Sequence, residues 1–133
     1  MKRMATMQLI IHQRSDERLN DAVDLMGKLA RAQKDFSDLS IYFHDLESIE
    51  SRAIINVLNF REFVSVGINS GILDEETYKR SYYSLMLRDW KNLRKTIEAI
   101  RTSRNGSPTN FQEFEKLVYR WEQKPIRKFA TRR

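Results

Sequence analysis

The chain has 133 residues, of which 41% are hydrophobic and 32% charged, and its formal net charge is +6. This length and composition suit one folded domain and exclude an intrinsically disordered chain. The absence of cysteine excludes disulfides, thiol catalysis and cysteine-ligated metals and agrees with a cytoplasmic location, and no apolar run reaches the roughly 18–20 residues that cross a bilayer.

Residues 1–35 are expected to form the first helix. Apolar residues recur at three- and four-residue spacing between Leu19 and Ala30, which indicates one buried helix face. The stretch before Ser15 has two interpretations: either its apolar residues extend the same face, or Ser15 or Asp16 caps a shorter helix. We favour one long helix, in which Gly27 marks a close helix crossing.

We expect residues 36–45 to form a connection, either a loop or a short helical turn. The second helix is predicted over residues 46–70, because its apolar residues cover much of the helix circumference, as in a central helix. Gly71 follows Asn69 and Ser70 and suits the left-handed residue that ends many helices.

Asp74 is expected to cap a third helix that ends near Ser103, because a carboxylate there accepts an unpaired backbone N–H. Residues 103–109, SRNGSPT, form the clearest loop of the chain. Asn110 and Glu113 predict a capping box at the start of a fourth helix, which Pro125 ends.

These elements predict an all-α fold, a bundle of about four helices around the second one. We expect a single helical domain over residues 1–124 and a basic C-terminal tail over residues 125–133.

Charge is distributed unevenly: the net charge is +3 for residues 1–34, −7 for residues 35–77 and +10 for residues 78–133. This contrast between an acidic middle and a basic C-terminal part is the strongest feature of the sequence that does not concern the fold.

The run LNFREFVSVGINSGILDEE, residues 58–76, resembles a bacterial and phage domain family of unknown function. The resemblance covers about residues 45–123 and rests on an Asn-Phe-x-Glu helix, a glycine-containing segment, a Gly-Ile-Leu-Asp-Glu boundary and two later tryptophans. The matching positions are Asn59, Phe60, Glu62, Gly67, Gly71, Ile72, Asp74, Glu75, Trp90 and Trp121. The resemblance implies a helical fold and implies no activity. The N-terminal hydrophobic anchor of several family members has no counterpart here.

Asn59 and Glu62 are polar residues in the most apolar predicted helix, one turn apart and so on one face. They could line a polar pocket or belong to a structural network, and we favour the structural network. Trp90 and Trp121 could form an aromatic platform for a base or a cation, but their place on apolar helix faces favours the core.

The sequence contains no phosphate-binding glycine loop, nucleophile elbow or zinc-protease motif, and its two histidines are far apart. We therefore expect no metal, no cofactor and no enzymatic activity.

A basic surface along the third helix and the C-terminal tail is the best functional lead. Its candidate contact residues are Arg88, Lys91, Arg94, Lys95, Arg101, Arg104, Lys124, Arg127 and Lys128. Such a surface suits an acidic protein or membrane partner or nucleic-acid phosphates, or it offsets the acidic segment 35–77. We expect a small helical interaction module whose partner is a protein, either another protein or a second copy. The alternative is a protein that binds the nucleic-acid backbone.

Overall fold

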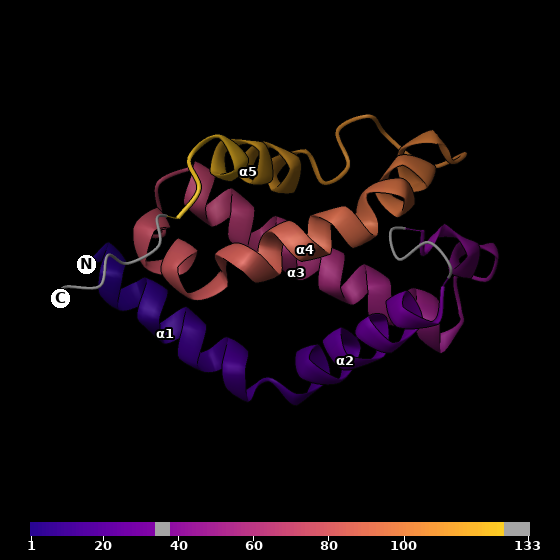
Figure 1. Cartoon of the computed structure of the whole chain (residues 1–133), viewed down its shortest axis with the longest axis horizontal. Coiled ribbons are helices and arrows are strands. Elements are labelled where there is room, and N and C mark those ends of the chain that lie inside the picture. Colours follow the sequence, from indigo (N-terminus) through magenta and orange to yellow (C-terminus); the bar gives the residue numbers. More distant parts are fainter. Residues whose placement is uncertain (34–37, 127–133) are drawn as a thin grey trace, which may run out of the picture.

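The computed structural model describes residues 1–33 and 38–126. Within these ranges the chain forms five α-helices and one 3-10 helix and no strand, which confirms the predicted all-α class. In chain order they are α1 (Lys2–Ser15), α2 (Glu17–Ala32), η1 (Ser40–His44), α3 (Ile49–Asn69), α4 (Glu75–Thr102) and α5 (Gln112–Gln123) (Figure 1). Two residues of the expected connection, 36 and 37, lie outside the described residues, as do residues 127–133 of the expected tail.

The prediction of one long first helix is wrong, because the chain breaks at Asp16. This residue adopts an extended conformation with φ −79° and ψ 100°, and its Oδ1 accepts the backbone N–H of Leu19 at 3.1 Å. The side chain thus satisfies a donor that has no partner within the new helix. The break separates α1 from α2, which run in different directions in Figure 1.

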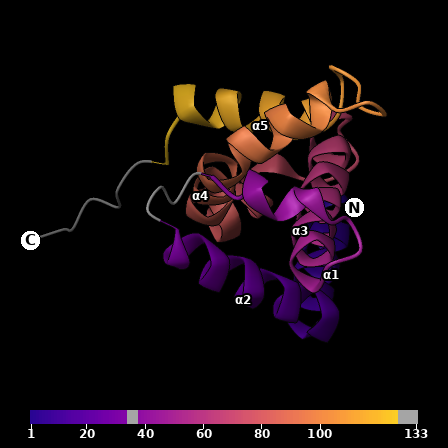
Figure 2. The same cartoon turned by 90° about the vertical axis from the view of Figure 1, so that its right-hand side faces the viewer.

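Helix α3 lies at the centre of the bundle, as its apolar circumference predicts. It packs against α2 on one side and against α5 on another, while α4 packs against α1 and α5 (Figures 1 and 2). Its fully buried residues include Ile54, Val57, Leu58 and Val64. Trp90 and Trp121 are buried core residues, and the Trp90 ring meets Phe114 edge-on.

The turn between α3 and α4 forms as predicted. Gly71 has φ +81°, a conformation that L side chains rarely adopt, and it reverses the chain after α3. Asp74 then caps α4, where its Oδ2 accepts the backbone N–H of Thr77 at 3.0 Å. The backbone N–H of Asp74 donates to Thr6 Oγ1 at 2.8 Å, so this turn also anchors α1.

The predicted Asn110–Glu113 capping box is wrong. Phe111 precedes α5 in a left-handed conformation with φ 59°, and it makes no side-chain cap. Asn110 Oδ1 instead accepts the backbone N–H of Ser107 at 2.8 Å and closes the preceding loop. The start of α5 is capped from another helix by Glu62, as described below.

None of the helices in the described part of the chain is long and apolar enough to cross a membrane.

Replacement of Asp16 by alanine removes the α2 cap. We expect Asp16→Ala to lower the free energy of unfolding by about 0.5–2 kcal/mol, measured by urea denaturation. Asp21→Ala, an exposed aspartate within the same helix, is the matched control and should change stability little. Equal losses in the two variants would show that the cap at Asp16 does not stabilise the break.

Candidate functional site

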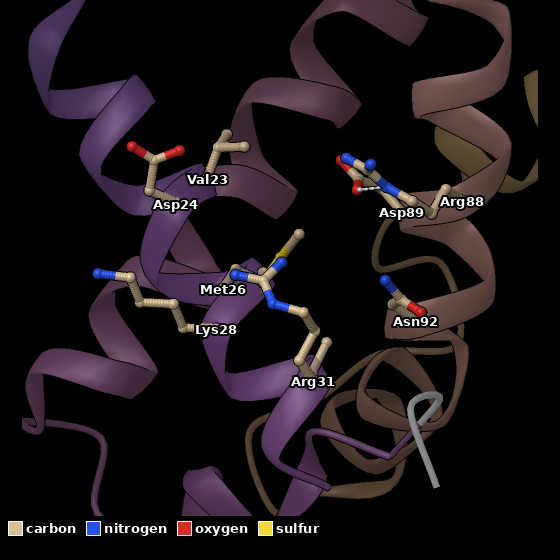
Figure 3. A pocket seen from close by; sticks show the side chains of 10 residues that line it. Val23, Asp24, Met26, Lys28, Arg31, Arg88, Asp89 and Asn92 are labelled. Atoms are coloured by element: carbon tan, nitrogen blue, oxygen red, sulfur yellow. Dashed lines mark ion pairs between the residues drawn. The ribbon is translucent and has the colours of Figure 1, made fainter.

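A groove with a cavity volume of about 510 Å³ lies between α2 and α4 (Figure 3). It exists because α2 packs mainly against α3 and α4 packs against α1 and α5, so the two helices face each other without close packing. Its lining residues are Val23, Asp24, Met26, Gly27, Lys28, Ala30 and Arg31 of α2 and Arg88, Asp89 and Asn92 of α4. Gly27 thus lies beside the groove, where the sequence suggested a close helix crossing.

Asp89, one of the lining residues, belongs to a buried ion pair. Arg61 of α3 donates from Nε to Asp89 Oδ2 of α4 at 2.9 Å, and the two side chains are 1% and 0% exposed. Burial raises the pKa of Asp89 above its ordinary value, against the opposing charges of Arg61 and Arg88. The pair therefore links two helices through charges that have lost most of their hydration.

The ion pair leaves two buried atoms without a hydrogen bond in the described structure, Arg61 Nη1 and Asp89 Oδ1. The nearest cation to Asp89 Oδ1 is Arg88, whose Nε lies 3.9 Å away, too far for a hydrogen bond. An unpaired buried polar atom costs roughly 1–3 kcal/mol. Asp89, which lines the groove, thus has one buried oxygen without a hydrogen bond.

Polar residues continue from the ion pair toward α1. The hydroxyl of Tyr78 donates to Gln13 Oε1 at 2.9 Å, and burial raises the pKa of Tyr78 to about 12. A second cavity of about 180 Å³ has Gln13 and Arg61 in its wall. Val23 borders both cavities, of which the first has Asp89 and the second Arg61 in its wall.

Arginines from the two facing helices dominate the charge of the groove. Figure 3 shows the side chain of Arg31 lying along α2 at one side of the groove, with Arg88 and Asn92 on the α4 side. Lys28 and Asp24 point to the other side of α2 in the same view. The lining residues Lys28, Arg31 and Arg88 outnumber the lining carboxylates Asp24 and Asp89, so the groove has an excess of positive charge.

The residues of the predicted basic surface differ in their exposure. Five of its members are exposed along α4 and the following loop: Arg88, Lys91, Arg94, Lys95 and Arg104. Arg101 is not available in the same way, because it donates to Glu115 Oε1 at 2.9 Å and to the backbone carbonyl of Asn110 at 2.8 Å. Lys124 is exposed after α5, while Arg127 and Lys128 lie outside the described residues.

The structure does not bring Asn59 and Glu62 into a shared network. Asn59 is exposed, whereas Glu62 is half-buried and accepts the backbone N–H groups of Phe114 at 2.8 Å and Glu113 at 3.4 Å. Burial raises the pKa of Glu62, although these two hydrogen bonds oppose the effect. Glu62 is thus the cap of α5, a role that ties α5 to α3.

The Arg61–Asp89 pair is not among the site residues predicted from the sequence. A signal was present, since Asp89 lies three residues after Met86 and four before Leu93, both fully buried. A charged residue on an apolar helix face requires a buried partner. No group of three or more metal-ligating residues in the described ranges is arranged to hold an ion.

The model of a family described as a domain of unknown function, DUF4760, matches residues 1–121. No curated protein and no solved structure matches the chain. The matched residues include α1 to α4 and most of α5, so the groove and its ion pair lie within the family domain.

Breaking the ion pair tests its role in the fold. We expect Arg61→Met and Asp89→Leu each to cost about 3–5 kcal/mol of unfolding free energy, because each leaves an uncompensated buried charge. The double variant should cost clearly less than the sum of the two, measured by urea denaturation. Arg80→Ala and Glu76→Ala break an exposed pair and serve as controls with little effect. Additive losses at Arg61 and Asp89 would contradict a direct interaction.

Proposed function

The chain belongs to the DUF4760 family of unknown function, and we propose that it is a non-enzymatic helical interaction module that binds a second copy of itself. The family match extends over nearly the whole chain, so the surfaces described below belong to the family domain. The description of the family assigns no activity, and the proposal therefore rests on exposed surfaces of the chain.

The carrying observation is an apolar stripe on the outer face of α1. Met4, Met7 and Ile11 are 69%, 46% and 61% exposed, although their spacing places them on one side of the helix. The opposite side of α1 is buried through Thr6, Ile10 and Gln13. A contiguous apolar stripe that faces solvent is typical of a surface that another molecule covers.

A second apolar surface, shaped as a groove, is a candidate partner for the stripe. An apolar groove of about 560 Å³ lies between η1, α3 and the end of α4, with Phe43, Leu46, Ile55 and Ile100 in its wall. Leu46 is exposed at its edge, and exposed Ile49 follows it at the start of α3.

The charges around the two surfaces are complementary. The α1 helix carries Lys2, Arg3 and Arg14 and no acidic residue. The segment beside the apolar groove carries Asp45, Glu47 and Glu50, of which Glu47 pairs with Arg52 at 3.3 Å. Opposite charge around matching apolar surfaces favours the contact of α1 from one copy with the groove of another.

The two surfaces lie at opposite ends of the long axis, with α1 at the left and η1 at the right of Figure 1. A contact between different surfaces of identical chains is head-to-tail, so each copy keeps one surface free for a further copy. The proposal therefore predicts chains or closed rings whose size depends on protein concentration.

Sedimentation velocity over about 10–500 μM protein tests this assembly. We expect species larger than a monomer, in amounts that rise with concentration. The double variants Met4→Glu/Ile11→Glu and Leu46→Lys/Ile49→Lys should each be monomeric, because each loses one surface. Phe63→Lys changes an exposed apolar residue elsewhere on α3 and should assemble like the wild type.

Mixing the two double variants distinguishes the head-to-tail contact from a symmetric one. Each variant keeps the surface that the other has lost, so the mixture should form a one-to-one dimer that cannot extend. A wild-type protein that stays monomeric over the whole concentration range would refute self-association. A mixture that stays monomeric would refute the pairing of these two surfaces.

A nucleic-acid-backbone binder is the second candidate function, because cations on α4 share an exposed side. Arg88, Lys91 and Lys95 follow one another at three- and four-residue spacing and are exposed, with Arg94 beside them. Such a stripe suits contacts with successive phosphates, which depend on charge and not on base sequence.

Charge reversal tests the second candidate. If it holds, the wild type should bind duplex DNA or single-stranded RNA at low salt, with an affinity that falls steeply as salt rises. Lys91→Glu/Arg94→Glu should abolish this binding, measured by fluorescence anisotropy. Arg18→Glu/Arg52→Glu makes the same change in charge elsewhere and should retain most of it. Undetectable binding at low salt would exclude this function.

A further inference from the structure

We propose that the groove between α2 and α4 binds a small phosphate monoester that also carries a hydroxyl group. In this arrangement Arg31 and Arg88 hold the phosphate, and the hydroxyl donates a hydrogen bond to Asp89 Oδ1. The inference does not depend on self-association, because the groove and the two proposed contact surfaces have different lining residues.

The groove is built for an anion by its two arginines. They come from facing helices and both line the groove, where the guanidinium of Arg31 lies along α2 and Arg88 projects from α4 (Figure 3). A phosphate monoester carries close to two negative charges at neutral pH, and its oxygens match the planar donors of guanidinium groups. The amide of Asn92, on the same side of α4 as Arg88, supplies a further polar group at the wall.

Asp89 requires a hydrogen-bond donor from the ligand, which a fully ionised anion does not provide. Its Oδ2 is already bonded to Arg61, but its fully buried Oδ1 has no hydrogen bond in the described structure. A hydroxyl group can donate to this oxygen, whereas a fully ionised phosphate has only acceptors to offer. The ligand therefore has an anionic end and a hydroxyl-bearing end.

The size and the walls of the groove agree with a ligand of this kind. A volume of about 510 Å³ lies within the usual range of small-molecule sites. Val23, Met26 and Ala30 provide an apolar wall against which the carbon skeleton can pack.

The absence of a side chain at Gly27 leaves room for the guanidinium of Arg31. A Cβ atom at residue 27 would lie 3.3 Å from Arg31 Nη1, which shows that the guanidinium folds back over this glycine. A larger side chain here would displace the guanidinium without a change in charge. Gly27→Val thus tests the placement of Arg31 separately from its charge.

Isothermal titration calorimetry with four probes tests the inference: ribose 5-phosphate, methyl phosphate, inorganic phosphate and ribose. We expect ribose 5-phosphate to bind most tightly, methyl phosphate and inorganic phosphate about tenfold or more weakly, and ribose not at all. Methyl phosphate lacks the hydroxyl, so its loss of affinity reports the contact with Asp89 Oδ1 without a substitution in the buried pair.

Variants of exposed residues locate the site. Arg31→Ala and Arg88→Ala should each weaken ribose 5-phosphate about tenfold or more, and Gly27→Val should weaken it as well. Lys91→Ala, the next exposed cation on α4, is the matched control and should bind like the wild type.

Three results would overturn the inference. They are the absence of ribose 5-phosphate binding at about 10 mM, an equal affinity for methyl phosphate, and an equal loss of affinity in Lys91→Ala. The last result would place phosphate on the outer surface of α4, as in nucleic-acid-backbone binding. Self-association is measured separately, so its failure and the failure of this ligand site remain distinguishable.

Discussion

The ion pair between Arg61 and Asp89 is the constraint on which the rest of the structure depends. It joins the central helix α3 to the long helix α4 inside the core. Charges that have lost their hydration tolerate little displacement, because a broken pair leaves an uncompensated ion in a medium of low polarity. The same pair includes Asp89, which lines the α2–α4 groove and keeps one buried carboxylate oxygen without a hydrogen bond. Stability and the candidate ligand site thus share one interaction.

Polar contacts at helix ends hold the remaining helices around this centre. Glu62 of α3 caps α5, and Glu75 at the start of α4 binds both Arg120, at 3.0 Å, and Trp121 Nε1, at 2.8 Å. Each carboxylate thus joins its own helix to α5. The ends of α3, α4 and α5 are therefore fixed, whereas the outer face of α1 keeps its apolar stripe exposed. For this reason we consider the outer face of α1 a candidate contact surface.

The sequence predicts correctly those features that depend on residues close together in the chain. The apolar periodicity of α3, the left-handed Gly71 and the Asp74 cap are of this kind. The sequence does not reveal the break at Asp16, because apolar residues before and after it are nearly in phase, although α1 packs on α4 and α2 packs on α3. The cap of α5 comes from a residue about fifty positions earlier, which no local motif reveals. Arg101 looked like a surface cation because its partner Glu115 lies on another helix.

Titration of the Asp89 carboxyl by carbon-detected NMR tests the central claim most directly. The structure places this group in a site where desolvation outweighs the attraction of Arg61, so its midpoint should lie above the ordinary value of 3.8. Such a shift means that the folded state binds the proton more tightly than the unfolded chain, and the shift's contribution to stability is lost as pH rises through the folded pKa. A midpoint at or below the ordinary value would contradict a buried, incompletely compensated carboxylate at the wall of the groove.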